Sequence, residues 1–291
     1  MKSLLFSLIL LPTLTHAFEV EQYPEERTYR IGESNYKQYG ATSLHQTGKF
    51  ALTFDDGPHP TLTTQVLDEL KKHNAKATFF VITSQINEST FPIIKRMLDE
   101  GHIVGSHGKS HDNSNTLTKD VWKSRVKNSF LELSKWYKRA GHSMDKLYYR
   151  FPYAAYGTRK DYNHMNALKE ISHELYGDNC IQFAFWDIDS GDWVPGMTAK
   201  EIAQNFSSSN EGGRFTGYKT VRNARGQKVQ VKAVETIKNP TAGGVVLQHD
   251  IQKGTVEGTK LILNYVKENN LEIIPLDEAE EFRVTKSCKL K

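Results

Sequence analysis

Residues 49–60 read KFALTFDDGPHP, an apolar run that ends in two adjacent aspartates and then in a Gly-Pro turn. The run has the length and composition of a buried β-strand. Neighbouring carboxylates repel each other, so a pair directly after such a strand requires a cause. Capping of the helix-like segment that follows would explain one aspartate, because acidic residues are favoured near a helix start. The second aspartate indicates a further role.

From Lys49 onward, short apolar runs alternate with longer segments in which apolar residues recur at spacings of three and four. The runs are FALTF, ATFFVI, HIVGS, LYYRF, FAFWDI, GVVLQ and LEIIP. This alternation predicts an α/β fold of about seven parallel strands with crossover helices, either a (β/α) barrel or an open doubly wound sheet. No GxGxxG follows the first run, which disfavours a dinucleotide-binding fold.

Two segments depart from this alternation. Residues 18–47 are polar and Tyr-rich, and we interpret them as an N-terminal extension that lies over the main domain, residues 48–291. Around residues 210–240, two alternating runs flank the stretch ARGQ, which predicts a β-hairpin insertion between two strands. Such a hairpin could line a substrate groove or extend into solvent, and the sequence does not distinguish these alternatives.

Residues 1–17 have the features of a secretory signal peptide: Lys2, an apolar centre too short to span a bilayer, and small residues at Thr15 and Ala17. We therefore expect an exported protein, periplasmic or secreted. In an exported chain, two cysteines suggest one disulfide between Cys180 and Cys288, although two unpaired thiols are almost as compatible with the sequence.

The 291 residues are 38% hydrophobic and 25% charged, which is ordinary for a soluble globular protein. The formal charge of +4 falls to +3 when residues 1–17, with one Lys and no acid, are removed. No basic stripe is apparent along the sequence, so we expect no nucleic-acid partner. No stretch beyond residues 1–17 is apolar over a length that could span a membrane, so we expect no membrane span. A monomer is favoured, with the oligomeric state left open.

Polar residues collect at the ends of five of the apolar runs. They are Asp55 and Asp56; His107 and His111; Arg150, Pro152 and Tyr153; Asp189, Asp192 and Trp193; and His249 with Asp250. The carboxyl ends of parallel strands gather on one face, and that face carries the active site in such folds. The pattern therefore predicts a single site.

His107 and His111 are four residues apart, a spacing that brings two imidazoles together on a helix face or in a tight loop. With a carboxylate from the Asp pair they would form a common three-ligand set for a divalent metal. Two exposed loop histidines would show the same spacing. Zinc suits these ligand types best, and cobalt or nickel would fit the same set.

Adjacent aspartates on an extended backbone point in opposite directions, so the two can have different roles. One could bind the metal while the other accepts a proton from metal-bound water, with Arg150 keeping that base ionised. His249 could then protonate the leaving group, with a carboxylate such as Asp192 on its other ring nitrogen. A lone histidine is more often a core residue; the neighbouring clusters favour the catalytic role.

These residues resemble the motifs of the polysaccharide deacetylases of carbohydrate esterase family four, the NodB-homology domain. Five motifs occur in the family's order over about residues 49–275: TFDDGP (53–58), HGKSH (107–111), RFPY (150–153), DSGDW (189–193) and LQH (247–249). The resemblance implies a distorted (β/α) barrel with fewer than eight strands. It also implies removal of acetyl groups from N-acetylated sugars, or in some members of O-acetyl groups from xylan. Because the signal peptide indicates export, we expect N-acetylglucosamine of peptidoglycan as the substrate before chitin oligomers, and xylan last.

The resemblance further implies the role of each residue. Asp55 would be the base and Asp56 would bind the metal with His107 and His111. The other implied roles are Arg150 holding the base, the Tyr153 N–H after Pro152 stabilising the oxyanion, Trp193 and Leu247 walling the acetyl pocket, and His249, tuned by Asp192, acting as the acid. Gly108 replaces the family's usual Ser or Thr, which leaves the loop geometry open. A non-catalytic carbohydrate-binding protein on this scaffold, or a two-metal hydrolase such as a phosphoesterase, remain the competing hypotheses.

Overall fold

The computed structural model describes residues 40–156, 164–284 and 288–291, and the structural statements below concern these residues. The expected signal peptide, residues 1–17, lies outside them, as does most of the expected N-terminal extension, residues 18–47. The described end of that extension contacts the main domain: Ala41 is buried, and its N–H donates a hydrogen bond to Asp187 (2.9 Å).

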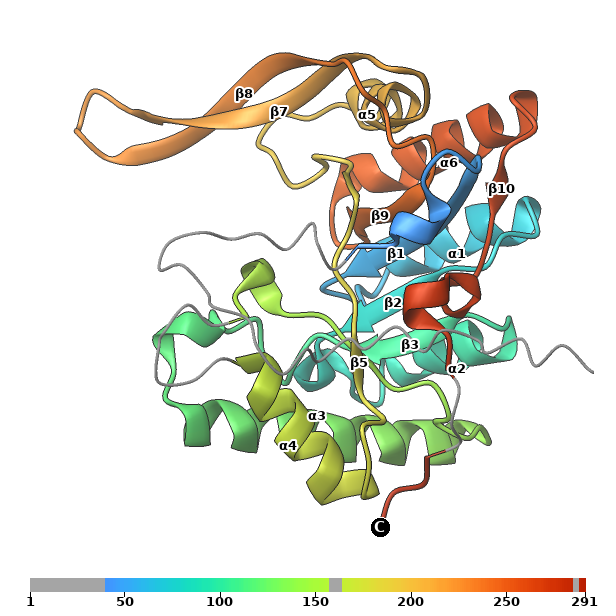
Figure 1. Cartoon of the computed structure of the whole chain (residues 1–291), viewed down its shortest axis with the longest axis vertical. Coiled ribbons are helices and arrows are strands. Elements are labelled where there is room, and N and C mark those ends of the chain that lie inside the picture. Colours follow the sequence, from blue (N-terminus) through green and yellow to red (C-terminus); the bar gives the residue numbers. More distant parts are fainter. Residues whose placement is uncertain (1–39, 157–163, 285–287) are drawn as a thin grey trace, which may run out of the picture.

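The fold is α/β, built on a curled parallel sheet, as predicted (Figure 1). Its strand order is β5-β4-β3-β2-β1-β9-β6, and β10 pairs in parallel with the start of β1. The strands are β1 (Lys49–Asp55), β2 (Thr78–Val81), β3 (Ile103–Ser106), β4 (Tyr148–Tyr149), β5 (Gln182–Phe183), β6 (Ile188–Asp189), β9 (Gly244–His249) and β10 (Glu272–Ile273). Both faces of the sheet are covered: Phe79 and Phe80, neighbours in β2, lie in separate hydrophobic clusters.

The apolar run FAFWDI, expected as one strand, contributes to two. β5 and β6 lie at opposite edges of the sheet although only residues 184–187 separate them. The carbonyl groups of Ala184 and Phe185 accept hydrogen bonds from the Arg150 side chain (2.9 and 3.0 Å), rather than from a neighbouring strand. This short segment therefore joins the two edges of the curled sheet, and it brings Arg150 between them.

The segments with helical periodicity between the apolar runs form six α-helices in the described ranges. They are α1 (Leu62–Lys72), α2 (Phe91–Asp99), α3 (Lys119–Ala140), α4 (His164–Tyr176), α5 (Ala199–Glu211) and α6 (Lys253–Glu268). α5 begins with a capping box between Thr198 and Glu201, and the C-terminus of α3 is capped by Gly141, whose φ of +84° suits glycine. None of the helices in the described ranges is long and apolar enough to cross a bilayer.

The predicted insertion is an antiparallel hairpin of β7 (Gly213–Arg222) and β8 (Lys228–Ile237). It projects from the rest of the molecule beside α5 (Figure 1). The disulfide that the sequence left open is present: Cys180 and Cys288 are bonded, with their Cα atoms 6.1 Å apart. It links the C-terminal segment to the residues that precede β5.

Candidate active site

The predicted polar clusters meet at the carboxyl edge of the sheet. β1 ends at Asp55, β9 ends at His249, and the two residues are direct partners on adjacent strands. His107 follows the last residue of β3, on the other side of β2. The strand ends therefore bring together groups that are far apart in the sequence.

Asp56, His107 and His111 form a compact group whose ligand-type atoms all lie within 4.8 Å of one another. The Nε2 atoms of His107 and His111 lie 3.5 and 3.4 Å from Oδ1 of Asp56. That oxygen is buried and has no hydrogen-bond partner among the described residues, a costly arrangement unless a cation occupies the centre. Two imidazoles and a carboxylate fit a divalent metal ion.

Two backbone features aim these ligands. Asp56 has a φ of +75°, so the chain turns sharply after Asp55, and both carboxylates approach Nε2 of His107, Asp56 at 3.5 Å and Asp55 at 3.8 Å. Nδ1 of His107 donates to the carbonyl oxygen of Arg150 (2.8 Å), which leaves Nε2 toward the triad. Burial lowers the pKa of His107 to about 3, so its ring is neutral and Nε2 carries a lone pair.

Gly108, where the family usually has Ser or Thr, has a φ of +87°, a conformation that glycine adopts without strain. A Cβ atom there would lie 3.3 Å from the carbonyl oxygen of Ser110. The Gly108 N–H donates to the Ser106 hydroxyl (3.1 Å). The departure therefore fits a tight loop that still brings His107 and His111 together.

Arg150 is fully buried and surrounded by acceptors. Its Nη1 donates to Oδ1 of Asp55 (2.9 Å) and to the hydroxyl of Thr53 (2.6 Å). Its Cζ lies 4.2 Å from the centre of the Phe80 ring. Burial raises the pKa of Asp55, and the Arg150 charge opposes that rise. The other Asp55 oxygen, Oδ2, lies 3.8 Å from Nε2 of His107, so this carboxylate borders the triad.

His249 and Asp192 form a second pair. Nδ1 of His249 lies 2.7 Å from Oδ1 of Asp192, and the His249 N–H donates to Oδ2 (2.6 Å). Thr255 also donates to Oδ2 (2.6 Å). Burial favours the neutral ring, but Asp192 and the aspartate pair outweigh it and raise the pKa of His249 to about 10. The imidazole is thus held in one orientation with Nδ1 engaged.

The remaining predicted site residues differ in how exposed their side chains are. Tyr153 is 64% exposed, and its ring centre lies 4.3 Å from that of His111. Trp193 is half-buried, and its Nε1 donates to Asp189 (3.2 Å). Pro152 and Leu247 are buried, so any contact they make with a substrate would be through a small exposed part. Their roles stay predictions.

Three residues support the site without having been assigned a role from the sequence. The Thr53 hydroxyl accepts a hydrogen bond from Arg150, and the Thr255 hydroxyl donates one to Asp192. Asp250 is buried beside the Gly-Pro turn. Thr63 donates a hydrogen bond to Asp250, and burial raises the pKa of this carboxyl to about 7. Thr53 and Asp250 each sit within or next to a motif, whereas nothing local marks Thr255.

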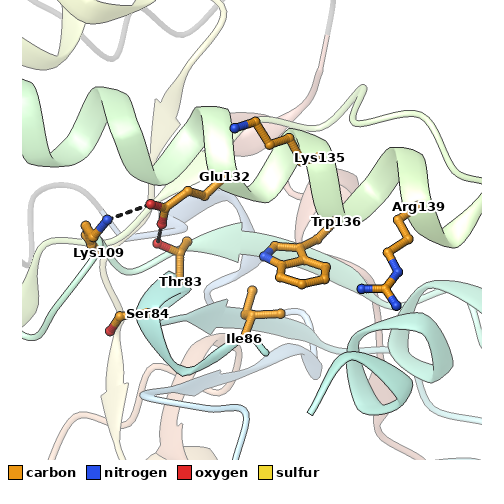
Figure 2. A pocket seen from close by; sticks show the side chains of 8 residues that line it. All are labelled: Thr83, Ser84, Ile86, Lys109, Glu132, Lys135, Trp136 and Arg139. Carbon is orange, nitrogen blue, oxygen red and sulfur yellow. Dashed lines mark hydrogen bonds and ion pairs between the residues drawn. The ribbon is translucent and has the colours of Figure 1, made fainter. Parts of the chain in front are cut away.

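A cavity of about 560 Å³ lies outside this group of residues, between the turn at Thr83–Gln85 and α3 (Figure 2). None of the predicted site residues lines it. Glu132 of α3 accepts from Lys109 (2.6 Å) and Thr83 (2.8 Å), so it ties the loop between the two triad histidines to the helix. This contact holds the loop between His107 and His111 against α3.

Comparison with known proteins agrees with the motifs. Residues 45–170 match the family model described as polysaccharide deacetylase. The chain belongs to the polysaccharide deacetylase family. Members similar to it include a peptidoglycan-N-acetylglucosamine deacetylase, PgdA, of Listeria monocytogenes, which is 31% identical over 230 residues, covering 79% of this chain and 38% of the relative.

A peptidoglycan-N-acetylglucosamine deacetylase of Bacillus cereus is 28% identical over 222 residues, covering 76% of this chain and 62% of the relative. The chain therefore spans less than two thirds of the length of both relatives. Among solved structures, a family 4 acetyl xylan esterase from Clostridium thermocellum in complex with a cobalt ion has a TM-score of 0.55 and 26% identity, covering 79% of this chain and 89% of that one. Together with the triad, this similarity supports a divalent metal in this family member.

Proposed function

We propose that this chain is a metal-dependent hydrolase that removes acetyl groups from an N-acetylated glycan. The substrate that we favour is N-acetylglucosamine of peptidoglycan. The main support for this proposal is that three groups of side chains meet at one edge of the sheet: the Asp55–Arg150 pair, the Asp56–His107–His111 triad and the Asp192–His249 pair. Amide hydrolysis needs a base, a stabilised oxyanion and an acid, and each has its own candidate here. The relatives from Listeria monocytogenes and Bacillus cereus support this substrate.

Asp56, His107 and His111 would hold the metal ion, with zinc the first choice and cobalt or nickel also suited. A divalent ion bound there would polarise the acetyl carbonyl and lower the pKa of water. The neutral state of His107 keeps a lone pair available for it.

Asp55 would accept the proton from the attacking water. Arg150 holds one of its oxygens and favours its ionised form, and the other oxygen borders the triad, so the proton acceptor is oriented. The raised pKa of this buried carboxyl makes it a stronger base than an exposed aspartate. The backbone N–H of Tyr153, whose ring packs on His111, would stabilise the oxyanion.

His249 would protonate the departing amine. Its pKa of about 10 keeps the ring protonated at neutral pH, and Asp192 fixes the nitrogen that is not used. Proton transfer by a positioned acid contributes about a hundredfold or more to the rate. Acetate and the free amine would then be the products.

We place this reaction outside the cytoplasm, as the expected signal peptide implies. The Cys180–Cys288 disulfide supports an exported protein, since such bonds persist in oxidising compartments. The glycan of a cell wall is found on that side of the membrane.

The test is acetate release from a panel: peptidoglycan strands, chitin oligomers and acetylated xylan, each with metal-loaded and chelator-treated protein. We expect metal-dependent release, greatest on peptidoglycan strands, and its loss in Asp55→Asn. Asp68→Asn, which changes an exposed carboxylate of α1, is the matched control. Binding of these glycans without acetate release would instead identify a carbohydrate-binding protein.

A further inference from the structure

The hairpin concentrates positive charge. Residues 213–238 contain seven Lys or Arg and one acidic residue, Glu235. Their net charge of +6 exceeds the +4 of the whole chain, so the remaining residues are net negative. The expectation that no basic stripe exists is therefore wrong for this segment. The basic residues were inconspicuous because they are dispersed along two strands, and only the pairing gathers them.

The charge lies mainly on one face of the hairpin. Side chains alternate between faces along a strand, and directly paired residues share a face. The face that includes Tyr218, here called the Tyr218 face, consists of Arg214, Thr216, Tyr218, Thr220, Arg222, Lys228, Gln230, Lys232, Val234 and Thr236. It holds four basic residues and no acid. The opposite face holds Lys219 and Glu235, whose charges cancel.

The Tyr218 face is the one that meets the site. The ring of Tyr218 contacts that of Trp193, with centroids 4.7 Å apart. Lys232 pairs with Glu201 at the start of α5 (2.6 Å). The Asn205 side chain accepts from the Thr216 N–H (2.7 Å) and donates to the Thr216 carbonyl (2.9 Å). These contacts hold the hairpin against α5 and against the loop that carries Trp193.

The outer half of the same face has cations without carboxylate partners. Arg222 and Lys228 are exposed and directly paired, and neither lies within ion-pair distance of an acid in the described ranges. Like charges directly opposite each other destabilise a strand pair. An anionic ligand would relieve this repulsion; within the hairpin, the Arg222 side chain donates only to the carbonyl oxygen of Gly226 (2.7 Å).

We propose that the Tyr218 face extends the substrate-binding surface beyond Trp193 and binds the carboxylate groups of an acidic glycan. This inference rests on the proposed function and specifies its substrate class. Trp193 and Tyr218 (44% exposed) offer adjacent aromatic surfaces for sugar rings, and Arg222 and Lys228 lie farther along the same face for the carboxylates. Chitin oligomers and xylan backbones without acidic groups would not use these cations.

An anionic membrane is the other polyanion that such a face could meet, but the hairpin tip argues against it. Residues 223–227 read NARGQ and contain no large apolar side chain to enter a bilayer. The exposed large hydrophobic residues of the hairpin, Tyr218, Val231 and Val234, lie away from the tip. The aromatic contact with the site favours the glycan.

The test compares two double variants of the full chain. Arg222→Gln/Lys228→Gln removes two charges from the Tyr218 face, and Lys219→Gln/Lys238→Gln removes two charges of the same hairpin from other positions. The probes are peptide-free glycan strands that carry lactyl carboxylates and chitin oligomers of equal length. Binding is measured by fluorescence anisotropy of labelled probes, and KM by acetate release.

We expect the first double variant to weaken binding of the acidic strands and raise their KM about tenfold, as exposed ion pairs of modest strength would. The chitin oligomer should be affected less than about twofold in either variant, as should the acidic strand in the control variant. The wild-type preference for the acidic strand should shrink as salt rises from about 50 mM to about 300 mM.

Equal wild-type affinity for acidic and neutral probes would overturn the proposal, as would equal losses in the two double variants. Sedimentation with phosphatidylglycerol vesicles is measured for the same proteins. If the wild type sediments with the vesicles and Arg222→Gln/Lys228→Gln does not, while glycan binding by that variant is intact, the face binds a membrane instead. Absence of acetate release from both probes would refute the deacetylase proposal, while the anisotropy data would still decide the binding proposal.

Discussion

Arg150 and Arg222 carry the same charge in opposite settings. Arg150 is fully buried, bonded to Asp55, Thr53 and two carbonyl groups, and lies between the two edges of the sheet. Arg222 is exposed on a two-stranded hairpin, where its Nη1 donates to the carbonyl oxygen of Gly226 (2.7 Å). Removing a buried charge that is paired strongly lowers the stability of the fold, whereas an exposed charge contributes little to stability and mainly affects which ligand binds.

The largest effect should come from breaking the buried pair. Arg150→Gln leaves Asp55 in the interior without its cation, and we expect a loss of about 3–5 kcal/mol in the free energy of unfolding. Urea denaturation at neutral pH measures this loss. Arg222→Gln is the matched exposed control and should change stability by less than about 0.5 kcal/mol. Similar values for both would contradict the contrast between the two regions.

The Asp192–His249 pair should show itself in the pH dependence of the rate. Asp192 raises the pKa of His249, so Asp192→Asn lowers it, and the acid is then deprotonated at a lower pH. The alkaline limb of the kcat profile should move toward lower pH, with kcat reduced about a hundredfold. Thr255→Val removes a neutral hydrogen bond to the same carboxylate and should leave that limb nearly in place. An unmoved limb in Asp192→Asn would count against His249 as the acid.

A smaller effect is expected where the hairpin is anchored. Asn205→Ala leaves the N–H and the carbonyl of Thr216 unpaired in a buried position, at a cost of about 1–3 kcal/mol. Amide exchange of β7 and β8 should accelerate, and the preference for acidic strands should fall while chitin oligomers are still processed. Gln204→Ala, beside it on α5, is the control. Unchanged exchange would mean that the hairpin is held by other contacts.

The parts predictable from the sequence share one property, a local period or a local spacing. The helices and most strands followed from apolar periodicity, and the convergence of Asp55, His107 and His249 followed because parallel strands end at one edge. The division of FAFWDI between β5 and β6 was not predictable, since its carbonyl partners come from the distant Arg150 side chain.

The charge on the hairpin was missed for a related reason. Arg222 and Lys228 share a face only after the two strands pair in register. The disulfide likewise depends on a distance across 108 residues that no local pattern encodes. Features that depend on pairing between residues far apart in the sequence could therefore not be predicted from local periodicity.

The two adjacent aspartates are proposed to have different roles, Asp55 in proton transfer and Asp56 in metal binding, and substituting each one separately tests this division. Metal content per chain and acetate release are measured for Asp55→Asn and Asp56→Asn, purified identically and loaded with zinc. We predict that Asp55→Asn retains one metal ion per chain while its acetate release falls by about a hundredfold or more, and that Asp56→Asn loses the metal. Normal acetate release by Asp55→Asn, or metal loss from it with retention in Asp56→Asn, would contradict the account.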